Sequence, residues 1–373
     1  MKIGIITSPI DEGHPSYTVY TYNLIKNLNL LDKENEYYLI HHTKMDLDIY
    51  KSNKEIIVPL PSFKPLKGLF WRYALLPKKL KTQNLDLVHD PRGIGLFSFD
   101  MPFEKVITIH DLSSLLYPSI NIRGMWAHRL LGTKTVKRVD KIITVSASTK
   151  RDVMKYLKAP EEKIKVIYNG KDERFKPLNQ KEVDKFKEKS NFNFPFILYV
   201  GVLQPRKNVP TLIKAYYKLK TDGTKHKLVI AGGKGWQYKE IFETIERLNL
   251  QKDVIFTEHI PDDDLPKLYN AADLFVFPSI YEGFGLPPLE AMACGIPVIA
   301  SNAGSLPEVV GDAGIKVNPY DVDGLAKAMH EVLNNDGLRQ DMIEKGLKRA
   351  KMFSWAKCAK EVLEVYEEVI SGD

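Results

Sequence analysis

The stretch PSIYEGFGLPPLEAMACGIPVIAS, residues 278–301, decides how the second half of the chain is expected to fold. It predicts a strand end, a glycine-bearing loop, a short helix and a second strand. Pro287 and Pro288 suit the first turn of a helix, where a missing N–H costs little. Gly295 suits the position just past the helix end. This strand–loop–helix–strand unit is typical of an α/β protein.

Two carboxylates flank the predicted start of this helix. Glu282 is expected in the loop and Glu290 in the first helical turn. Gly283 and Gly285 allow the backbone to approach a ligand, and their N–H groups lie at a helix N-terminus, which favours an anion. A phosphate-bearing ligand with hydroxyls, meaning a nucleotide or a sugar nucleotide, fits this combination. The two glutamates taken alone could equally be a loop acid and a partner of the helix dipole.

Length and composition indicate a globular protein of two or three domains. The chain has 373 residues, is 44% hydrophobic and 27% charged, and holds two cysteines, Cys294 and Cys358. The cysteines allow no disulfide framework and favour a reduced, cytoplasmic setting. No apolar run reaches the roughly 18 residues that a membrane span needs, and the N-terminus reads as a strand rather than a signal peptide.

Positive charge is concentrated in the first half. Residues 1–170 hold 26 Lys and Arg against 17 Asp and Glu, a net of +9, whereas the rest carries a net of −2. Such a field favours anionic partners such as phosphorylated substrates or a membrane surface. An ordinary lysine-rich, solvated surface is the alternative. We expect no nucleic-acid partner.

Strand and helix patterns alternate along both halves. Apolar runs such as KIGII (2–6) and FILYV (196–200) are separated by helical spacing, which predicts parallel sheets with right-handed crossovers. The polar region 168–194 interrupts this rhythm and is interpreted as the interdomain connection. We therefore predict two doubly wound α/β domains, 1–175 and 176–353. A large two-part ligand would bind in the cleft between them.

Polar residues follow several strand ends of the first half. Gly13 lies in the loop after the first strand, where its backbone could contact phosphate or sugar, although a glycine there is also common for turn geometry alone. His110 and Asp111 directly follow the strand KVITI. A neutral imidazole at that place could donate to or accept from a reacting hydroxyl, or could simply be bonded into its loop. His89 is a weaker copy of the same pattern.

Arg206 and Lys207 form a cationic pair in the turn GVLQPRKN (201–208), after the strand FILYV. A forked guanidinium and an ammonium can clamp a diphosphate and stabilise it as it leaves. A solvated basic turn is the alternative. No D-x-D cluster suited to Mg²⁺ or Mn²⁺ is found, and Asp262–Asp264 is better interpreted as a helix N-terminus. We therefore expect no metal and no cofactor.

The second half resembles the donor domain of a retaining glycosyltransferase of family 4, with the two-domain GT-B fold. The resemblance rests on GVLQPRKN (201–208), LVIAGGKGW (228–236), the stretch 269–301 with Glu282 and Glu290 as a Glu-x7-Glu motif, and LPEVVGDAG (306–314). The first half resembles the same family more loosely. The resemblance implies a final helix, 355–371, that packs back on the first domain.

This resemblance also implies a reaction and a set of roles. A hexose would pass from a nucleotide diphosphate sugar, as co-substrate, to a hydroxyl of a glycan or lipid-linked acceptor, with retention of anomeric configuration and without a metal. Arg206 and Lys207 would hold the diphosphate, Glu290 the ribose, and His110 would lie beside the reacting centre. Further donor contacts are implied for Gly13, Glu282, Gly283, Phe284, Gly285 and Leu286. His14 and Tyr17 could instead shape an acceptor pocket.

The identities of the donor and the acceptor are less clearly indicated by the sequence. GDP-mannose is the first expectation, because the chain resembles mannosyltransferase-like members, with glucose or N-acetylglucosamine donors as alternatives, in polysaccharide, lipopolysaccharide or glycolipid synthesis. Residues 63–81 mix lysines and arginine with aromatic side chains. This pattern fits a helix on the anionic inner face of a membrane, or an ordinary amphipathic helix. A sugar-nucleotide epimerase and a non-catalytic sugar-nucleotide-binding subunit are the rival functions.

Overall fold

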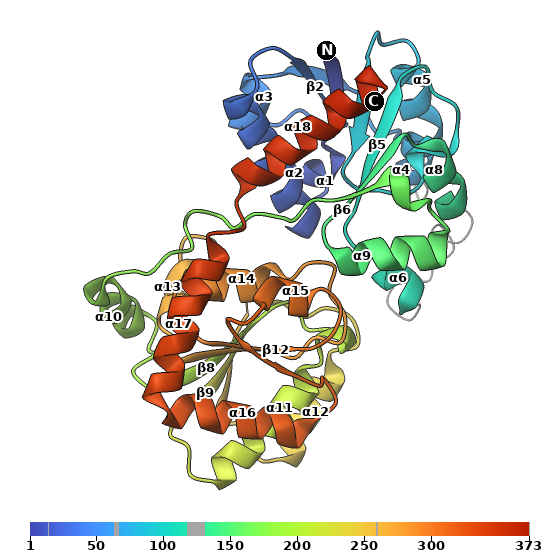
Figure 1. The fold of residues 1–373 in the computed structure, drawn as a ribbon. Helices are drawn as coiled ribbons and strands as arrows, with labels where there is room; N and C mark the ends of the chain where they lie inside the picture. Colours follow the sequence, from blue (N-terminus) through green and yellow to red (C-terminus); the bar gives the residue numbers. More distant parts are fainter. Residues whose placement is uncertain (14, 63–66, 118–130, 259, 373) are drawn as a thin grey trace. The chain divides into compact units, whose positions relative to one another are not determined.

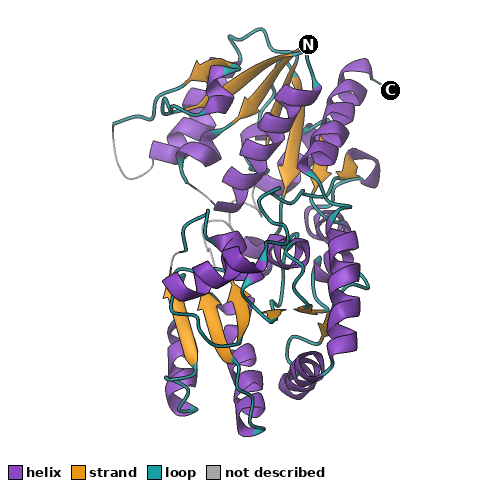
Figure 2. Cartoon of the chain, turned by 90° about the vertical axis from the view of Figure 1, so that its left-hand side faces the viewer, coloured by secondary structure: helices purple, strands orange, loops and turns teal. Residues whose placement is uncertain are grey.

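The chain forms two α/β units, each built on one parallel sheet, in a computed structural model that describes residues 1–13, 15–62, 67–117, 131–258 and 260–372. Residues 1–170 and 354–373 make the first unit, and residues 171–353 make the second. The sequence had suggested a boundary at residue 175. Figure 1 shows helices on both faces of each sheet, and Figure 2 shows the strands flanked by them.

The first sheet has seven strands in the order β3-β2-β1-β4-β5-β6-β7, all parallel. Apolar, β-branched runs buried on both faces are what a parallel sheet requires. The strands are β1 (Lys2–Ile6), β2 (Glu36–His41), β3 (Lys54–Ile57), β4 (Leu87–Asp90), β5 (Glu104–Ile109), β6 (Lys141–Thr144) and β7 (Ile164–Val166).

Helices cover both faces of this sheet. Alternate side chains of β5 enter opposite cores, Val106 on one face and Ile107 on the other. The α-helices of this unit are α1 (Ser8–Asp11), α2 (Pro15–Leu31), α3 (Asp48–Lys51), α4 (Lys67–Phe70), α5 (Leu76–Leu80), α6 (Ser113–Leu116), α8 (Thr133–Arg138), α9 (Ala147–Asp152) and α18 (Trp355–Ser371).

Helix α18 belongs to the first unit although it ends the chain. Its Trp355, Val362 and Tyr366 enter the same core as α2, and the ring Nδ1 of His89 lies 2.6 Å from the Tyr366 hydroxyl. Lys141 pairs with Glu368. His89 is therefore a buried histidine that anchors this helix.

The second sheet has six parallel strands in the order β10-β9-β8-β11-β12-β13. They are β8 (Phe196–Val200), β9 (Lys227–Ala231), β10 (Val254–Glu258), β11 (Leu274–Phe277), β12 (Val298–Ser301) and β13 (Ile315–Val317). The α-helices are α10 (Gln180–Lys189), α11 (Val209–Thr221), α12 (Lys239–Arg247), α13 (Leu265–Asn270), α14 (Leu286–Ala293), α15 (Leu306–Val310), α16 (Val322–Asn334) and α17 (Asp336–Ala350).

The polar region 168–194 is not simply a connection. It contains α10, which begins where the Asn179 side chain accepts from the backbone N–H of Glu182. Val183 and Phe186 are the buried residues of this otherwise charged helix. Two apolar side chains three residues apart bury one narrow stripe, and this signal was hidden by the many lysines and acids around it.

The segment 63–81, interpreted from the sequence as a helix, contains three short helical parts. Helices α4 and α5 flank a π-helical turn, η1 (Trp71–Leu75), next to Pro77, and a proline in this position disturbs the regular hydrogen-bond ladder. Residues 63–66 of this segment lie outside the described residues.

Candidate functional site

The strand order of the second sheet reverses at β8, whose neighbours are β9 and β11. In open parallel sheets the crevice beyond such a reversal point is where ligands bind. The loops that leave the carboxyl ends of β8 and β11 are 201–208 and 278–285, and these are the two loops singled out in the sequence. They are joined directly, because the backbone N–H of Ile280 donates to the carbonyl of Arg206 at 2.8 Å.

Arg206, Lys207 and Glu282 meet where these loops join and form what we term the cation cluster. The Lys207 ammonium is 2.6 Å from Oε1 of Glu282, and the Arg206 guanidinium is 3.0 Å from Oε2. The Ser279 hydroxyl also donates to Oε1, at 2.6 Å. Side-chain exposures are 14% for Arg206, 11% for Lys207 and 8% for Glu282. Two positive charges thus face one buried negative charge.

The two cations keep Glu282 ionised. Burial alone would raise the pKa of Glu282, but the charges of Arg206 and Lys207 lower it to about 2. The cluster therefore carries a net charge of +1 at neutral pH. A site that binds a polyanion such as a diphosphate needs a net positive charge of this kind.

The turn that carries the cations is held by its neighbour, Asn208. This residue adopts a left-handed conformation with φ +58°, which asparagine tolerates better than most residues. Its side-chain amide donates to the carbonyls of Pro278 and Pro319, at 3.1 and 2.6 Å, and its oxygen accepts from the Thr211 hydroxyl at 2.8 Å. The conformation is thereby locked, and the adjacent cations are fixed on the Glu282 side.

The glycine loop is shaped by Gly285 and closed by Ser305. Gly285 has φ +104° and precedes α14 directly, a conformation that glycine adopts without cost. The Ser305 hydroxyl contacts the carbonyls of Glu282 and Phe284, at 3.1 and 2.6 Å. Phe284, Gly283 and Leu286 line this same turn, so the predicted donor loop is a single, internally bonded unit.

Helix α14 corrects one expectation and supports another. Pro287 stands in the first turn and Gly295 follows the helix with φ +76°, as predicted. Glu290, however, lies beyond the first turn, because the helix already begins at Leu286. Its carboxylate accepts from the Tyr269 hydroxyl at 2.9 Å, and burial raises the pKa of Glu290 to about 7.

In the first unit, His110 follows β5 and is bonded into its surroundings. Its Nε2 donates to the carbonyl of Pro91 at 2.9 Å, so the neutral ring carries its proton on Nε2 and offers Nδ1 as an acceptor. The edges of Tyr17 and Tyr20 pack against the ring at 4.9 and 4.8 Å between centroids. Burial lowers the pKa of His110 to about 4, against the opposing effect of Asp111.

Gly13 stands in the loop after β1, at the reversal point of the first sheet, between β2 and β4. It is exposed and has φ +65°, and a methyl group built on it would meet no described atom within 4 Å. His14, the alternative acceptor contact, lies outside the described residues. Gly13 and His110 are thus the candidate residues of the first unit, and the cation cluster is the candidate site of the second.

Only part of the basic aromatic segment 63–81 is exposed at the protein surface. Trp71 and Arg72 are buried, with the Trp71 indole N–H bonded to the Val58 carbonyl and the Arg72 guanidinium 2.5 Å from Asp90. These two residues therefore belong to the core, contrary to a helix lying flat on lipid. Leu69 and Phe70 of α4 are exposed. Among the described residues, no helix combines the length and the apolar character that crossing a bilayer requires.

Three contributors to the site were missed in the sequence. Ser279 and Ser305 hold Glu282 and its loop, and Tyr269 bonds Glu290. Ser279 could have been suspected, since it directly follows a buried strand. Nothing in the sequence distinguishes Tyr269 from other helical tyrosines.

Comparison with known proteins assigns the family. Residues 18–175 match the model of glycosyltransferase family 4, and residues 180–349 match that of the glycosyl transferases group 1. The chain is 30% identical to O-antigen chain mannosyltransferase B of Escherichia coli, with 98% of this chain and 100% of that protein covered. The chain is a group 1 glycosyltransferase.

Other similarities of this glycosyltransferase agree with the two-unit architecture. It is 32% identical to the serotype-specific mannosyltransferase WbdA of Escherichia coli over 76% of its own length and 36% of that protein. It is similar in structure to the sucrose-phosphate synthase of Thermosynechococcus elongatus, with a TM-score of 0.82, 22% identity and full coverage of both chains. The glycosyltransferase thus has the GT-B fold, with two parallel-sheet α/β units.

Proposed function

We propose that this glycosyltransferase transfers mannose from GDP-mannose to a hydroxyl of a growing O-antigen or a related polysaccharide. The observation that carries the proposal is the match over nearly the whole chain to an O-antigen chain mannosyltransferase. The partial match to a second mannosyltransferase supports the same sugar.

The transfer is proposed to retain the anomeric configuration. The bond between the sugar C1 and the diphosphate oxygen breaks, and a bond from C1 to the acceptor oxygen forms on the same face. The acceptor proton passes to the departing diphosphate. Arg206 and Lys207 would stabilise the charge that develops on this leaving group. The net charge of the cation cluster supports this role, and Glu282 would orient both cations.

The remaining roles are those that the family resemblance implies. Glu290 would accept hydrogen bonds from the ribose hydroxyls. The N–H groups of the loop 283–286 would face the donor at the start of α14. His110 would accept from a hydroxyl of the donor sugar through Nδ1, and the Gly13 backbone would approach the diphosphate. Contact of Glu282 with the transferred sugar, implied by the family resemblance, stays a prediction, since three side chains already engage its carboxylate.

Donor identity is tested with the purified protein and a panel of sugar nucleotides. Ligand binding raises the melting temperature, and we expect the largest rise with GDP-mannose rather than UDP-glucose or UDP-N-acetylglucosamine. Transfer is then followed with a mannose-ended acceptor, and the anomer formed is read by NMR. A larger response to a uridine nucleotide would overturn the GDP-mannose proposal. Conversion of the donor alone to an epimer would point to an epimerase, and binding without any turnover to a non-catalytic subunit.

We also propose that the first unit rests against an anionic membrane surface, where a lipid-linked acceptor would be found. The exposed Lys67, Leu69 and Phe70 of α4 support this proposal, together with the net charge of +9 over residues 1–170. Co-sedimentation with phosphatidylglycerol vesicles should occur at low salt and fade as salt screens the charges. Replacing Leu69 and Phe70 by serine should weaken it, and equal binding to neutral vesicles would contradict the proposal.

A further inference from the structure

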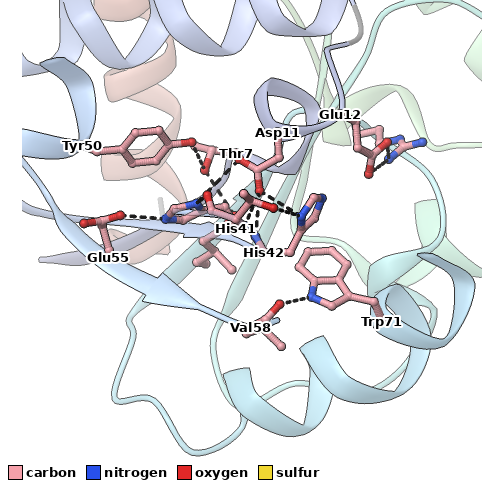
Figure 3. A network of polar contacts seen from close by, with 12 residues as sticks. Thr7, Asp11, Glu12, His41, His42, Tyr50, Glu55, Val58 and Trp71 are labelled. Carbon is pink, nitrogen blue, oxygen red and sulfur yellow. Dashed lines mark hydrogen bonds and ion pairs between the residues drawn. The ribbon is translucent and has the colours of Figure 1, made fainter. Parts of the chain in front are cut away.

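The segment that follows β1, made of the short helix α1 and the turn Glu12–Gly13 and called the loop below, is tied to the strand on one side of it through Asp11 at the end of α1. This carboxylate is fully buried, and its Oδ2 accepts from the backbone N–H groups of His42 and Thr43, at 2.8 and 3.0 Å. Both residues directly follow the carboxyl end of β2, and Figure 3 shows Asp11 beside His42. A buried carboxylate is tolerated only when hydrogen bonds or charges compensate it, so this contact holds the loop at a defined place.

His41 adds further contacts to the same tie. Its Nδ1 donates to the Thr43 carbonyl at 2.8 Å and lies 3.6 Å from Oδ1 of Asp11. Its Nε2 is 3.0 Å from Glu55, and Tyr50 stacks on the ring at 4.5 Å. Burial alone would lower the pKa of His41, but Asp11 and the other acceptors raise it. The ring has acceptors at both nitrogens and lies between the carboxylates of Asp11 and Glu55 (Figure 3).

The next residue, Glu12, ties the loop to the strand on its other side. Both of its carboxylate oxygens accept from the Arg92 guanidinium, at 2.9 and 2.7 Å. Arg92 stands in the loop after β4, and its backbone N–H donates to Asp90 at 3.0 Å. Asp90 is itself buried and paired with Arg72. The second tie is therefore anchored in the core.

Asp11 and Glu12 directly precede Gly13, and β2 and β4 are the two neighbours of β1 in the sheet. The loop is thus fastened to both neighbouring strands at the reversal point of the sheet, immediately before an exposed glycine with positive φ. An untied loop would have to be ordered when a ligand binds, which costs conformational entropy. The contacts of Asp11 and Glu12 already order the loop before a ligand binds, so this entropy cost is avoided.

We propose that Asp11 and Glu12 are positioning residues, which hold the Gly13 backbone in place for the diphosphate of the sugar nucleotide. This inference rests on the proposed function, because it presumes a phosphate-bearing donor at Gly13. Neither side chain contacts the donor in this proposal; each acts through the place it gives to the loop. The role differs from that of the cation cluster, which belongs to the other unit.

The Glu12–Arg92 pair allows a decisive test, because its side chains are 30% and 31% exposed and their exchange should cost little stability. The charge reversals Glu12→Arg and Arg92→Glu are made singly and together, and kcat and KM for GDP-mannose are measured. Each single reversal should lower kcat/KM by roughly ten- to a hundredfold, as expected when a contact is misplaced by about 1 Å. The double variant, which restores the pair in reverse, should recover most of the loss.

Asp11 is tested by a graded pair of variants. Asp11→Asn keeps an oxygen for the two backbone N–H groups and should retain more activity than Asp11→Ala, which removes both bonds. The exposed pair of Glu36 and Lys54 in the same sheet is the control, and Glu36→Arg should leave kcat/KM unchanged. Melting temperatures separate loss of position from loss of the fold.

The outcomes distinguish the inference from the proposed function. If the wild-type protein turns over no sugar nucleotide, the proposed function fails. If the wild type is active and both single reversals match it in kcat and KM, the positioning role is overturned. A double variant as poor as the single variants, with an unchanged melting temperature, also overturns it.

Discussion

Lys207 Nζ lies 2.6 Å from Oε1 of Glu282, and Arg206 binds the other oxygen of the same buried carboxylate at 3.0 Å. Lys207 and Glu282 are 75 positions apart in sequence. They meet where the loops after β8 and β11 join. One carboxylate thus orients both cations that are proposed to face the leaving group. Its removal should affect stability as well as activity.

Glu282→Gln should destabilise the second unit by about 3–5 kcal/mol, because breaking a buried ion pair leaves uncompensated charge behind. The free energy of unfolding is measured with urea. The matched control is Glu331→Gln on the exposed face of α16, which should change stability by less than about 0.5 kcal/mol. Equal stability of the two variants would contradict a structural role for Glu282.

The same carboxylate predicts how stability changes with acid. The pKa of Glu282 is lowered from its ordinary value of 4.5 to about 2. Its stabilising contribution is therefore complete above about pH 4.5 and is lost as pH falls toward about 2. Urea unfolding followed over this range should show a steeper loss in the wild type than in Glu282→Gln. Parallel curves would show that another group dominates acid unfolding.

Glu290 predicts a pH dependence of the opposite kind. Burial raises its pKa from 4.5 to about 7, and the Tyr269 hydroxyl only partly offsets this. For an acid with a raised pKa, the stabilising contribution is present below about pH 4.5 and is lost as pH rises through about 7. The ribose hydroxyls, as donors, should bind the ionised form better. Affinity for GDP-mannose should therefore rise between about pH 6 and about pH 8.

Calorimetry with the intact sugar nucleotide checks this prediction, because its diphosphate has no ionisation near neutrality. Glu290→Gln should bind more weakly at the higher pH and should lose the pH dependence. If the wild type and the variant show the same slope, Glu290 does not contact the ribose.

The sequence predicted elements more reliably than contacts. Pro287 and Gly295 placed helix α14 correctly, because local backbone chemistry limits where a helix begins and ends. The helix begins at Leu286, one residue before Pro287, so Glu290 stands just past the first turn instead of in it. For residues 63–81 a membrane-surface helix and an ordinary amphipathic helix were both left open, and the burial of Trp71 and Arg72 could not be predicted, since residue type alone does not show which side of a helix meets the core.

The residues of the candidate site were predicted from the sequence. The hydrogen bonds and ion pairs between them were not predicted. Arg206, Lys207 and Glu282 were all named, but the ion pairs that join the carboxylate to both cations were not foreseen. Such pairing depends on how two distant loops meet in space. The tie through Asp11 and His41 was missed for the same reason, since it depends on the sheet register that places β1 beside β2.

His110 should act as a neutral residue throughout the physiological range. Burial lowers its pKa to about 4, so the pH profile of kcat should show no inflection near 6.5, where an ordinary histidine titrates. His110→Ala should lower kcat by roughly tenfold, the worth of about one hydrogen bond. His89, buried under α18, is unsuitable as a control because it anchors the fold. A wild-type inflection that disappears in His110→Ala would mean that the ring ionises during turnover.

The cation cluster predicts that turnover needs no divalent metal. Its net positive charge would neutralise the departing diphosphate in the place that a bound cation takes in other enzymes. Mannose transfer in excess EDTA should therefore match transfer with added Mg²⁺. Arg206→Ala should lower kcat by roughly a hundred- to a thousandfold, the usual cost of losing one transition-state donor. Arg206→Lys should recover part of this loss, because a lysine keeps the charge but not the fork.

Of the two cations, Arg206 is the better one to substitute. The Arg206→Lys variant keeps the positive charge opposite Glu282 and removes only the forked geometry of the guanidinium. Added Mg²⁺ should not rescue Arg206→Ala, because the fixed geometry beside Tyr281 and Glu282 would still be missing. Loss of wild-type activity in EDTA, restored by Mg²⁺, would contradict the prediction. Normal turnover of Arg206→Ala would contradict the role of the guanidinium itself, and the two results are independent of each other.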